Sequence, residues 1–524
     1  MTVAGPRPRT TSGLPLAAVA QAVGVASSAD VEVTGVGLDS RTVQPGDLYA
    51  ALPGANTHGA RFAAAVAERG AVAVLTDPAG AELMRASGVD LPALVVCDPR
   101  AVLGAVAALV YANAGPGGAA DIGLTLIGVT GTNGKTTTAY LLEGALRALG
   151  TRTGLIGTVE IRVDDQRITS SRTTPEAPDL HALIATMRER GVGTCVMEVS
   201  SHALALHRVD GLVYDLALFT NLSQDHLDMH GSMEEYFAAK ASLFTPGRAR
   251  AGVVCVDDSW GRRLARESGI PVVTLGQADG ADIRLSVNFD GTFTLQGSVA
   301  APGRSGERIT VDLTSKSALP GSFNAVNTAL ATVTLLLLGY AADDVERALV
   351  TDPHVPGRME EVSVRDPDGL PRGIVDYAHT PDAVSVALAA LRPEASGGLI
   401  VVLGAGGDRD RGKRAAMGRA AAEGADVVVV TDDNPRSEDP TLIRAALLAG
   451  AKAANTTARL LDIGDRRTAI RAAVDEAIAR GPGVIVAVVG KGHEVGQERA
   501  GVVEPFDDRV ELRAALDAAG RSGR

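Results

Sequence analysis

The sequence predicts an α/β protein of about three domains. Its 524 residues are too many for one ordinary core, because domains average roughly 100–200 residues. Two long regions, starting near residues 124 and 373, alternate short apolar runs with helical stretches. These runs are nearly continuous, as is typical of parallel strands buried on both faces of a sheet. A glycine-rich loop after the first run indicates a nucleotide-binding α/β fold.

Composition excludes several classes of protein. Hydrophobic residues make up 46% and charged residues 21%, which indicates a globular rather than a disordered chain. A net charge of -12 argues against a nucleic-acid partner. Cys97, Cys195 and Cys255 are scattered, so neither a disulfide framework nor a structural zinc site is expected. No apolar run reaches the ~18 residues of a membrane helix. We therefore expect a cytoplasmic protein with small-molecule partners and no membrane contact.

The first predicted domain covers residues 1–120. Residues 14–25 resemble a weak secretion signal, but their apolar side chains share one helical face, which favours an ordinary amphipathic helix. Short strands are predicted after it, over residues 31–38, 71–75 and 93–97. The Gly/Pro/Ala-rich stretch 113–120 is the predicted boundary.

The second predicted domain covers residues 121–353. Its buried strands are predicted over residues 124–129, 195–199, 216–220 and 253–256. The pattern then changes, because residues 283–289 and 292–296 alternate around an Asp290–Gly291 turn and predict an antiparallel hairpin. A helix over residues 325–338 closes the domain.

The third predicted domain covers residues 354–524, after a Pro-rich boundary at residues 352–357. Apolar strands are predicted over residues 373–377, 399–403, 427–431 and 484–489, with helical stretches between them. This pattern is typical of a doubly wound, Rossmann-like sheet.

The strongest motif is Val-Thr-Gly-Thr-Asn-Gly-Lys-Thr-Thr at residues 129–137, between a strand and a helix. Backbone N–H groups and the dipole at such a helix start favour phosphate. Lys135 would pair with the β- and γ-phosphates, and the Thr136 hydroxyl would hold Mg²⁺. Val129 stands where the strict pattern has glycine, so this is a variant loop. The candidate loop residues are Gly131, Thr132, Asn133, Gly134, Lys135, Thr136 and Thr137. The loop alone does not distinguish an ATPase, a GTPase, a kinase and a ligase, although no NKxD guanine motif is present.

Two later strands end in metal-type residues. Glu198 and His226 follow neighbouring apolar strands and are expected at the edge that carries the phosphate loop. For one such residue alone, above all for a lone histidine, a capping or loop role is the simpler interpretation. Two consecutive strands that end in such residues at one edge favour a metal site instead. Lys240 lies between apolar residues of a predicted helix, and this pattern most simply indicates a solvated or snorkelling lysine.

Four loops of the third domain follow strands and should meet at one crevice. They cover residues 376–382, 403–414, 432–440 and 490–494. Arginines beside aspartates and glutamates suit a zwitterion, since arginine binds a carboxylate and acids bind an ammonium. Structural salt bridges are the alternative reading of the same residues.

The order and spacing of these motifs resemble the Mur ligases over nearly the whole chain. The resemblance rests on residues 39–41, 130–137, 198–202, 221–226, 321–324, 356–360, 376–381, 406–409, 433–436, 490–494 and 506–509. It implies a three-domain Mur ligase architecture: an N-terminal domain for a UDP end, a central P-loop-type ATPase domain and a C-terminal Rossmann-like domain for an amino acid.

The resemblance also implies site residues. Lys135, Glu198, His226 and Lys240 would be catalytic, with Lys240 carbamylated by CO₂. Thr136, Glu198, His226 and the carbamate would form the metal shell. Asn324, Arg358, Asp376 and His379 would join the loop in binding ATP. Ser40, Thr173, Thr174, Ser200, Arg208 and Lys240 would bind UDP-MurNAc-dipeptide. Arg409, Asn434 and Arg436 would hold the acceptor's distal carboxylate, with Asp433, Gly490 and Glu494 around its ammonium group.

The implied reaction adds diaminopimelate to the D-Glu of UDP-MurNAc-L-Ala-D-Glu through an acyl phosphate, with ATP and Mg²⁺, by a monomeric enzyme. The Asp-Asn-Pro-Arg motif at residues 433–436 favours diaminopimelate over lysine as the acceptor. The alternatives are a lysine-adding Mur ligase, a folylpolyglutamate synthetase and a nucleotide-binding switch without ligase activity. The sequence leaves open whether the meso or the LL isomer is used.

Overall fold

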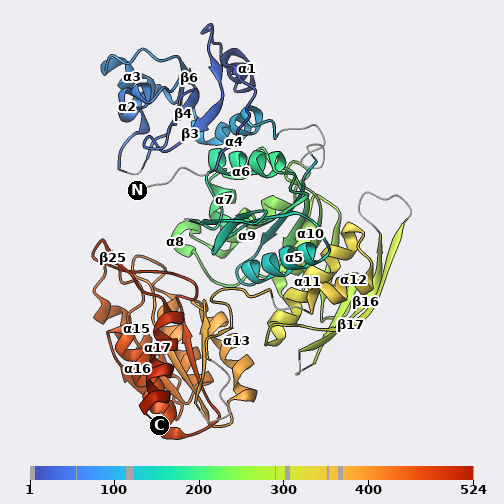
Figure 1. The fold of residues 1–524 in the computed structure, drawn as a ribbon, viewed down its shortest axis with the longest axis vertical. Helices are drawn as coiled ribbons and strands as arrows, with labels where there is room; N and C mark the ends of the chain where they lie inside the picture. The colour runs from blue at the N-terminus through green and yellow to red at the C-terminus, as the bar shows by residue number, and fades with distance from the viewer. Residues whose placement is uncertain are drawn as a thin grey trace.

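The computed structural model describes residues 6–54, 56–113, 123–170, 172–288, 291–300, 307–350, 353–363 and 370–522. The chain forms three α/β bodies that follow one another along the long axis of the molecule (Figure 1). Most of the predicted boundary at residues 113–120, residues 351–352 of the second boundary, and residues 289–290 of the hairpin turn lie outside the described residues. Within the described part, no helix combines the length and the apolar character needed to cross a membrane.

The N-terminal body is a small parallel sheet covered by helices. Its strands, in sheet order, are β3 (Gly35–Gly37), β4 (Asp47–Ala51), β5 (Ala73–Thr76) and β6 (Ala93–Val95). Its helices are α1 (Leu16–Ala22), α2 (Ala63–Glu68), α3 (Pro78–Ala86) and α4 (Pro99–Val110). The predicted strand over residues 31–38 is wrong as a single element. It divides into β2 (Glu32–Val33), which pairs with β1 (Leu14–Pro15), and β3, which pairs with β4.

The central body holds an eleven-stranded sheet. In sheet order its strands are β10 (Gln166–Thr169), β9 (Glu160–Val163), β8 (Thr153–Ile156), β11 (Thr194–Glu198), β7 (Thr125–Thr130), β12 (Tyr214–Phe219), β13 (Ala249–Cys255), β14 (Val272–Gly276), β15 (Ile283–Val287), β16 (Thr292–Ala300) and β17 (Arg308–Lys316). The predicted strands β11, β7, β12 and β13 are parallel, as expected. The unpredicted strands β8 and β14 extend this parallel stretch on either side, and β15 pairs in parallel with β14. The predicted hairpin is β15–β16, and it continues into the unpredicted β17 as one edge of the same sheet.

The helices of the central body are α5 (Lys135–Ala148), α6 (Ala177–Glu189), α7 (Ser201–Ala205), α8 (Leu227–His230), α9 (Met233–Ala241), α10 (Ser259–Glu267), α11 (Ser322–Leu338) and α12 (Ala342–Leu349). The apolar side chains of α5 and α11 pack in one core with β7 and β12. On the side of α6, three alanines pack against Val106 and Val110 of α4, which joins the central body to the N-terminal one.

The C-terminal body has the predicted doubly wound sheet. In sheet order its strands are β18 (Glu360–Glu361), β19 (Arg372–Asp376), β23 (Val484–Val489), β20 (Gly398–Leu403), β21 (Val427–Val430) and β22 (Arg459–Asp462). Its helices are α13 (Pro381–Leu391), α14 (Lys413–Gly424), α15 (Pro440–Ala453), α16 (Arg466–Arg480) and α17 (Asp508–Ser522). All pairs except β18–β19 are parallel, so the loops after β19, β20, β21 and β23 share one edge. An unpredicted hairpin, β24 (Gln497–Arg499) and β25 (Val502–Glu504), lies outside this sheet.

A buried ion pair ties the C-terminal helices to the end of β23. The Arg466 guanidinium donates to both carboxylate oxygens of Asp508 at 2.7 Å and to the Val489 carbonyl at 3.0 Å. Both side chains are fully buried. Because removing one partner leaves an uncompensated charge, Asp508→Asn is expected to lower the free energy of unfolding by about 3–5 kcal/mol. Urea unfolding followed by circular dichroism measures this loss.

The adjacent pair of Arg467 and Glu511 is the matched control. It has similar geometry, with two contacts of 2.7 Å, but the Arg467 side chain is half exposed. Glu511→Gln is therefore expected to cost less than about 1 kcal/mol. Equal losses in the two variants would contradict a special role for burial.

Candidate functional site

The glycine-rich loop joins β7 to α5 as predicted. Gly131 and Gly134 have φ values of +142° and +88°, which side chains rarely adopt. A Cβ at Gly131 would also collide with the Thr220 hydroxyl. Asn221, at the end of β12, closes the loop from the other side. Its side-chain oxygen accepts from the Asn133 N–H at 3.0 Å, and its amide donates to the Asn133 carbonyl at 3.1 Å. These contacts fix the conformation of the loop, and α5 starts directly after it.

Two lysines meet at this loop. Lys135 donates to the carbonyls of Gly131 and Thr132 at 2.9 and 2.8 Å, and Lys240 donates to the same Gly131 carbonyl at 2.7 Å. Lys240 is only 1% exposed, so the prediction of a solvated lysine was wrong. The reason is that α9 packs its Tyr236 and Lys240 against the loop, with the ammonium 4.6 Å from the tyrosine ring centre. Burial, with the nearby Lys135 charge, lowers the pKa of Lys240 well below its ordinary value. Burial also lowers the pKa of Lys135.

Glu198 lies beside the loop, as expected from its position at the end of an apolar strand. Its carboxylate accepts from the Thr136 hydroxyl at 3.0 Å and from the Thr158 N–H at 2.8 Å. Arg358, from the third domain, donates to the same Thr136 hydroxyl at 2.9 Å. The start of α5 and the end of β11 therefore place one hydroxyl and one carboxylate at the loop, next to a cation.

His226 begins α8 in a left-handed conformation, with φ of +54°. Its ring packs edge-on against His202, with 4.8 Å between centres, and burial lowers its pKa to about 3. In the described part of the chain, no three or more His, Cys, Asp and Glu side chains are arranged to hold a metal. The pair of Thr136 and Glu198 still suits Mg²⁺, which commonly takes one or two carboxylates and completes its shell with phosphates and water.

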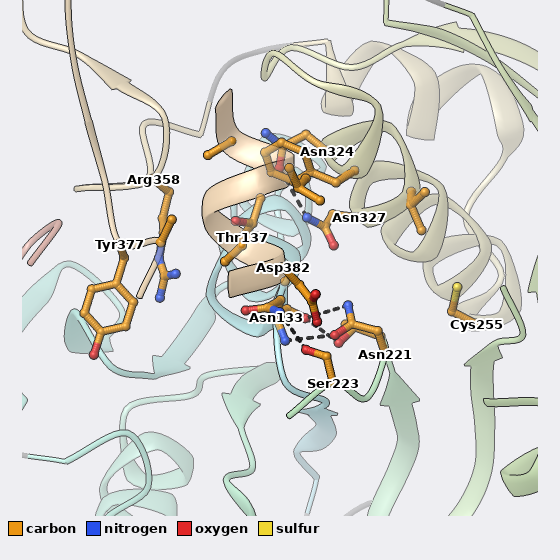
Figure 2. A pocket seen from close by; sticks show the side chains of 18 of the residues that line it. Asn133, Thr137, Asn221, Ser223, Cys255, Asn324, Asn327, Arg358, Tyr377 and Asp382 are labelled. Carbon is orange, nitrogen blue, oxygen red and sulfur yellow. Dashed lines mark hydrogen bonds between the residues drawn. The ribbon is translucent and has the colours of Figure 1, made fainter. Parts of the chain in front are cut away.

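A cavity of about 490 Å³ opens between the central and C-terminal bodies, beside the loop (Figure 2). Six predicted nucleotide-binding residues line it: Asn133, Gly134, Thr137, Asn324, Arg358 and Asp376. Sequence reasoning missed Asn221, Asn327 and Phe323, which also line it. Their signal was weak, because polar and aromatic residues at a strand end or helix start have many ordinary roles. The cavity has the position expected for the nucleoside part of a nucleotide whose phosphates reach the loop.

Charged contacts cross between the two bodies next to this cavity. Asp225 of the central body accepts from Lys413 at 3.1 Å and lies 3.6 Å from the predicted nucleotide residue His379. Burial alone would raise the pKa of Asp225. The hydrogen bond and charge of His379, with the charges of His226 and Lys413, outweigh this effect and lower the pKa overall. The site is therefore assembled from both bodies.

The predicted dipeptide-binding residues of the central body gather at the end of β11. Thr174 donates to the Glu198 carbonyl at 2.8 Å and to the Ser200 hydroxyl at 3.3 Å. Arg208 donates to the Thr174 carbonyl at 3.4 Å. Thr173 accepts from Thr158, itself a neighbour of Glu198, at 3.0 Å. Ser40 follows β3 in the N-terminal body and is half-buried. Its role at a UDP end stays a prediction.

The four predicted loops of the C-terminal body do meet at one edge of its sheet. Asn434 lies at their centre: its amide donates to Glu494 at 3.0 Å, and its oxygen accepts from Lys491 at 3.1 Å. Tyr377 donates to the same glutamate at 3.4 Å. The Gly490 N–H donates to the Asp376 carbonyl at 3.1 Å. A carboxylate, an amide, a phenol and an ammonium group from these loops thus lie together at this edge.

The arginines at this edge of the sheet differ in whether they pair with Glu438. Arg411 and Arg414 pair with Glu438 at 3.2 and 2.9 Å, and the hydrogen bond from Arg414 lowers the pKa of this glutamate to about 2. For Arg411 and Arg414 the structure therefore shows the salt bridges that were the alternative to ligand binding. Arg409 is exposed, and Arg436 donates to the Gly407 carbonyl at 2.7 Å. Arg436 also lies 3.5 Å from Glu498, and the role of these two arginines in holding a ligand's carboxylate stays a prediction.

Asn221 offers a direct test of the loop geometry. Asn221→Ala removes two hydrogen bonds to Asn133, each contributing about 1 kcal/mol. Together the two bonds contribute about 2 kcal/mol, so the KM for ATP is expected to rise by up to about thirtyfold, since ~1.4 kcal/mol corresponds to a factor of ten. Steady-state kinetics over an ATP series measures it. Ser223→Ala removes one 3.4 Å contact with Asn133 and is the control, with less than about a twofold change expected. An unchanged KM for ATP in Asn221→Ala would contradict the role of these two hydrogen bonds.

The fold and this site define an ATP-dependent ligase built from three domains, and comparison with known proteins gives the family. Residues 32–111 match the model of the Mur ligase family catalytic domain, residues 129–335 the Mur ligase middle domain, and residues 357–492 the Mur ligase glutamate ligase domain. The chain belongs to the Mur ligase family, whose members are ATP-dependent amide-forming ligases.

Individual relatives match over nearly the full length. A protein of Streptomyces avermitilis named UDP-N-acetylmuramoyl-L-alanyl-D-glutamate–2,6-diaminopimelate ligase is 51% identical, covering 98% of this chain and 99% of its own. A UDP-N-acetylmuramyl-tripeptide synthetase of Leifsonia xyli is 49% identical, covering 98% of both chains. A solved structure of a ligase with the same name as the Streptomyces protein aligns with a TM-score of 0.61 and 30% identity, covering 98% of this chain and 100% of that one. The MurF ligase of Thermotoga maritima in complex with ADP shares the fold, with a TM-score of 0.62 and 18% identity over 93% of this chain and 99% of that one.

Proposed function

We propose that this protein joins diaminopimelate to the D-Glu carboxylate of UDP-MurNAc-L-Ala-D-Glu, using ATP, in the synthesis of the peptidoglycan precursor. The observation that carries the proposal is the acceptor crevice. Its Asp433–Arg436 loop is intact and lies against Glu494 and the end of β23, in a chain that matches diaminopimelate ligases over nearly all of its length. Both small-molecule substrates are cytoplasmic metabolites, and we place the enzyme there.

The central and C-terminal bodies contribute different parts of the reaction. The cavity and loop bind ATP, and the loop N–H groups with Lys135 stabilise charge on the phosphates. The D-Glu carboxylate attacks the γ-phosphorus, giving ADP and an acyl phosphate. The acceptor amine then attacks the acyl carbon, the amide forms, and phosphate leaves as the amine loses its proton. Two anions and an amine must meet in order, so the main contribution of the protein is positioning. The contacts of Asp225 with the C-terminal body bring the acceptor crevice toward the loop.

Mg²⁺ would be held by Thr136 and Glu198 beside the ATP phosphates, with His226 as a further predicted ligand. Bound there, it would supply positive charge that offsets the repulsion between phosphate and carboxylate. The hydroxyl and carboxylate at 3.0 Å from one another fit such a role. Arg358, which also donates to Thr136, adds a fixed cation at the same place.

Lys240 would be carbamylated. Its neutral amine would attack CO₂ and release one proton, giving a carbamate anion in place of an ammonium. Burial favours the neutral amine, and a carbamate would remove the like-charge contact with Lys135. Protein equilibrated with ¹³C-labelled bicarbonate should show a carbamate carbon resonance that Lys240→Ala lacks. A spectrum unchanged by that substitution would reject the assignment.

An acceptor panel tests the function. The purified protein is mixed with ATP, Mg²⁺, UDP-MurNAc-L-Ala-D-Glu and one of meso-diaminopimelate, LL-diaminopimelate, L-lysine or no acceptor. Phosphate release and product mass are read together. We expect a UDP-tripeptide with diaminopimelate. The arm that gives product, meso or LL, shows which isomer is the substrate. Product with lysine alone would replace the proposal by a lysine ligase. ATP turnover that is independent of every amino acid would favour a nucleotide switch.

A further inference from the structure

The β24–β25 hairpin lies directly against the acceptor loop. Its two-residue turn, Ala500 and Gly501, has positive φ at both positions, +50° and +79°, as a tight hairpin turn requires. Figure 1 shows the hairpin at the end of the C-terminal body that faces the rest of the molecule. Arg436 of the acceptor loop pairs with Arg499 of β24 as an isolated parallel bridge. The acceptor loop is therefore extended by a second, later segment of the chain.

The hairpin fixes the backbone of Arg436. The Arg436 N–H donates to the Glu498 carbonyl at 3.1 Å, and the Ala500 N–H donates to the Arg436 carbonyl at 2.7 Å. Arg436 has a φ of +52°, a left-handed conformation that is uncommon for a side chain of this size. Such conformations persist where the surrounding structure holds them, and they cluster at ligand sites. Here two backbone hydrogen bonds from the hairpin hold it.

Side-chain and backbone groups of β24 fix the rest of the loop. The amide of Gln497 donates to the Asp433 carbonyl at 2.7 Å, and the Glu498 N–H donates to the Asn434 side-chain oxygen at 3.0 Å. The Glu498 carboxylate lies 3.5 Å from Nε of Arg436, while Nη1 donates to the Gly407 carbonyl. These contacts hold two nitrogens of the guanidinium. Among the described residues, Nη2 makes no hydrogen bond and is free to meet a ligand.

We propose that the β24–β25 hairpin is a specificity element for the distal end of the acceptor, with Glu498 as the positioning residue that orients Arg436. The inference rests on the proposed function, because Arg436 needs a distal carboxylate to bind. Glu498 lies at the Nε edge and Gly407 accepts from one terminal nitrogen, so among the described residues the remaining nitrogen has no partner. A diaminopimelate carboxylate meets an arginine that is already oriented, whereas lysine has no group to meet it.

Kinetics of Glu498→Ala test the proposal. The Glu498 side chain is 39% exposed, so the ion pair is of the partly exposed kind. Its loss is expected to raise the KM for diaminopimelate about fivefold. The kcat, the KM for ATP and any residual use of lysine are expected to stay within about twofold, because these do not depend on the orientation of Arg436. Glu498→Gln keeps an oxygen that can accept from Nε and is expected to restore most of the affinity.

Glu504→Ala is the matched control, because Glu504 pairs with Gln497 on the other strand of the same hairpin and is exposed. It should leave the KM for diaminopimelate unchanged. A lower KM in Glu498→Ala would mean that the glutamate competes with the substrate, and an unchanged KM would mean that it has no role; either result overturns the inference. Wild-type protein that makes no product with diaminopimelate would overturn the proposed function itself, which is a separate result.

Discussion

Replacing Lys135 by alanine is expected to lower kcat about 1000-fold, the largest effect of any single substitution in the site. The Lys135 ammonium donates to two carbonyls of the loop, so it lies at the place where the phosphates are proposed to bind. On ATP binding it would exchange these carbonyls for phosphate oxygens. Removing one preorganised donor from a developing anion costs roughly a factor of 100 to 1000, and here a full positive charge is lost as well. Phosphate release in the complete reaction measures kcat.

The substitution must be separated from a loss of folding. Lys316→Ala is the matched control, because Lys316 is an exposed lysine on β17 of the same body. It should leave kcat and the melting temperature unchanged. ADP binding by Lys135→Ala, measured by calorimetry, should weaken far less than kcat falls. A kcat within about tenfold of wild type would remove Lys135 from the catalytic step.

Arg436→Ala is expected to lower kcat/KM for diaminopimelate about 100-fold, since about 2.7 kcal/mol of charge-assisted hydrogen bonding is lost. The KM for ATP should stay unchanged, because Arg436 belongs to the acceptor crevice and does not line the nucleotide cavity. Arg436→Lys keeps the charge but loses the planar fork of donors, so a loss of about tenfold is expected to remain. An acceptor and an ATP series, run separately, measure the two parameters.

Arg411→Ala is the control for this experiment. Arg411 is an exposed arginine of the same edge and pairs with Glu438 at 3.2 Å. Its removal should change kcat/KM for diaminopimelate by less than about twofold. If Arg436→Ala impaired ATP and diaminopimelate use equally, the residue would have a general structural role instead of a role in acceptor recognition.

Most of the strands that carry the site could be predicted from the sequence. Strands buried on both faces read as continuous apolar runs, and Val484–Val489 is buried at every residue. Once these runs are placed in parallel sheets, the residues after them must share one edge. That reasoning brought Glu198 to the glycine-rich loop and gathered the four acceptor loops, and the structure has both arrangements.

Several of the missed strands lack an apolar signal, although the buried strand β8 and the largely apolar strand β14 were missed as well. The residues of β22 are partly or fully exposed, and Val502 and Val503 of β25 are more than half exposed. Lys240 was misread for a different reason: its burial comes from contact with Gly131, which is more than a hundred residues earlier in the chain. The two hydrogen bonds between Asn221 and Asn133 likewise join residues that are far apart in the chain. Local patterns cannot report such contacts.

The gathering of all four acceptor loops on a single sheet has an evolutionary consequence. That sheet has its own hydrophobic core, formed with its own helices and separate from the core beneath the glycine-rich loop. Substitutions in loops after β20, β21 and β23 can therefore change which amino acid is accepted while the phosphate chemistry is inherited intact. A lineage could replace one cross-linking amino acid of its cell wall by another through a few substitutions in this one domain.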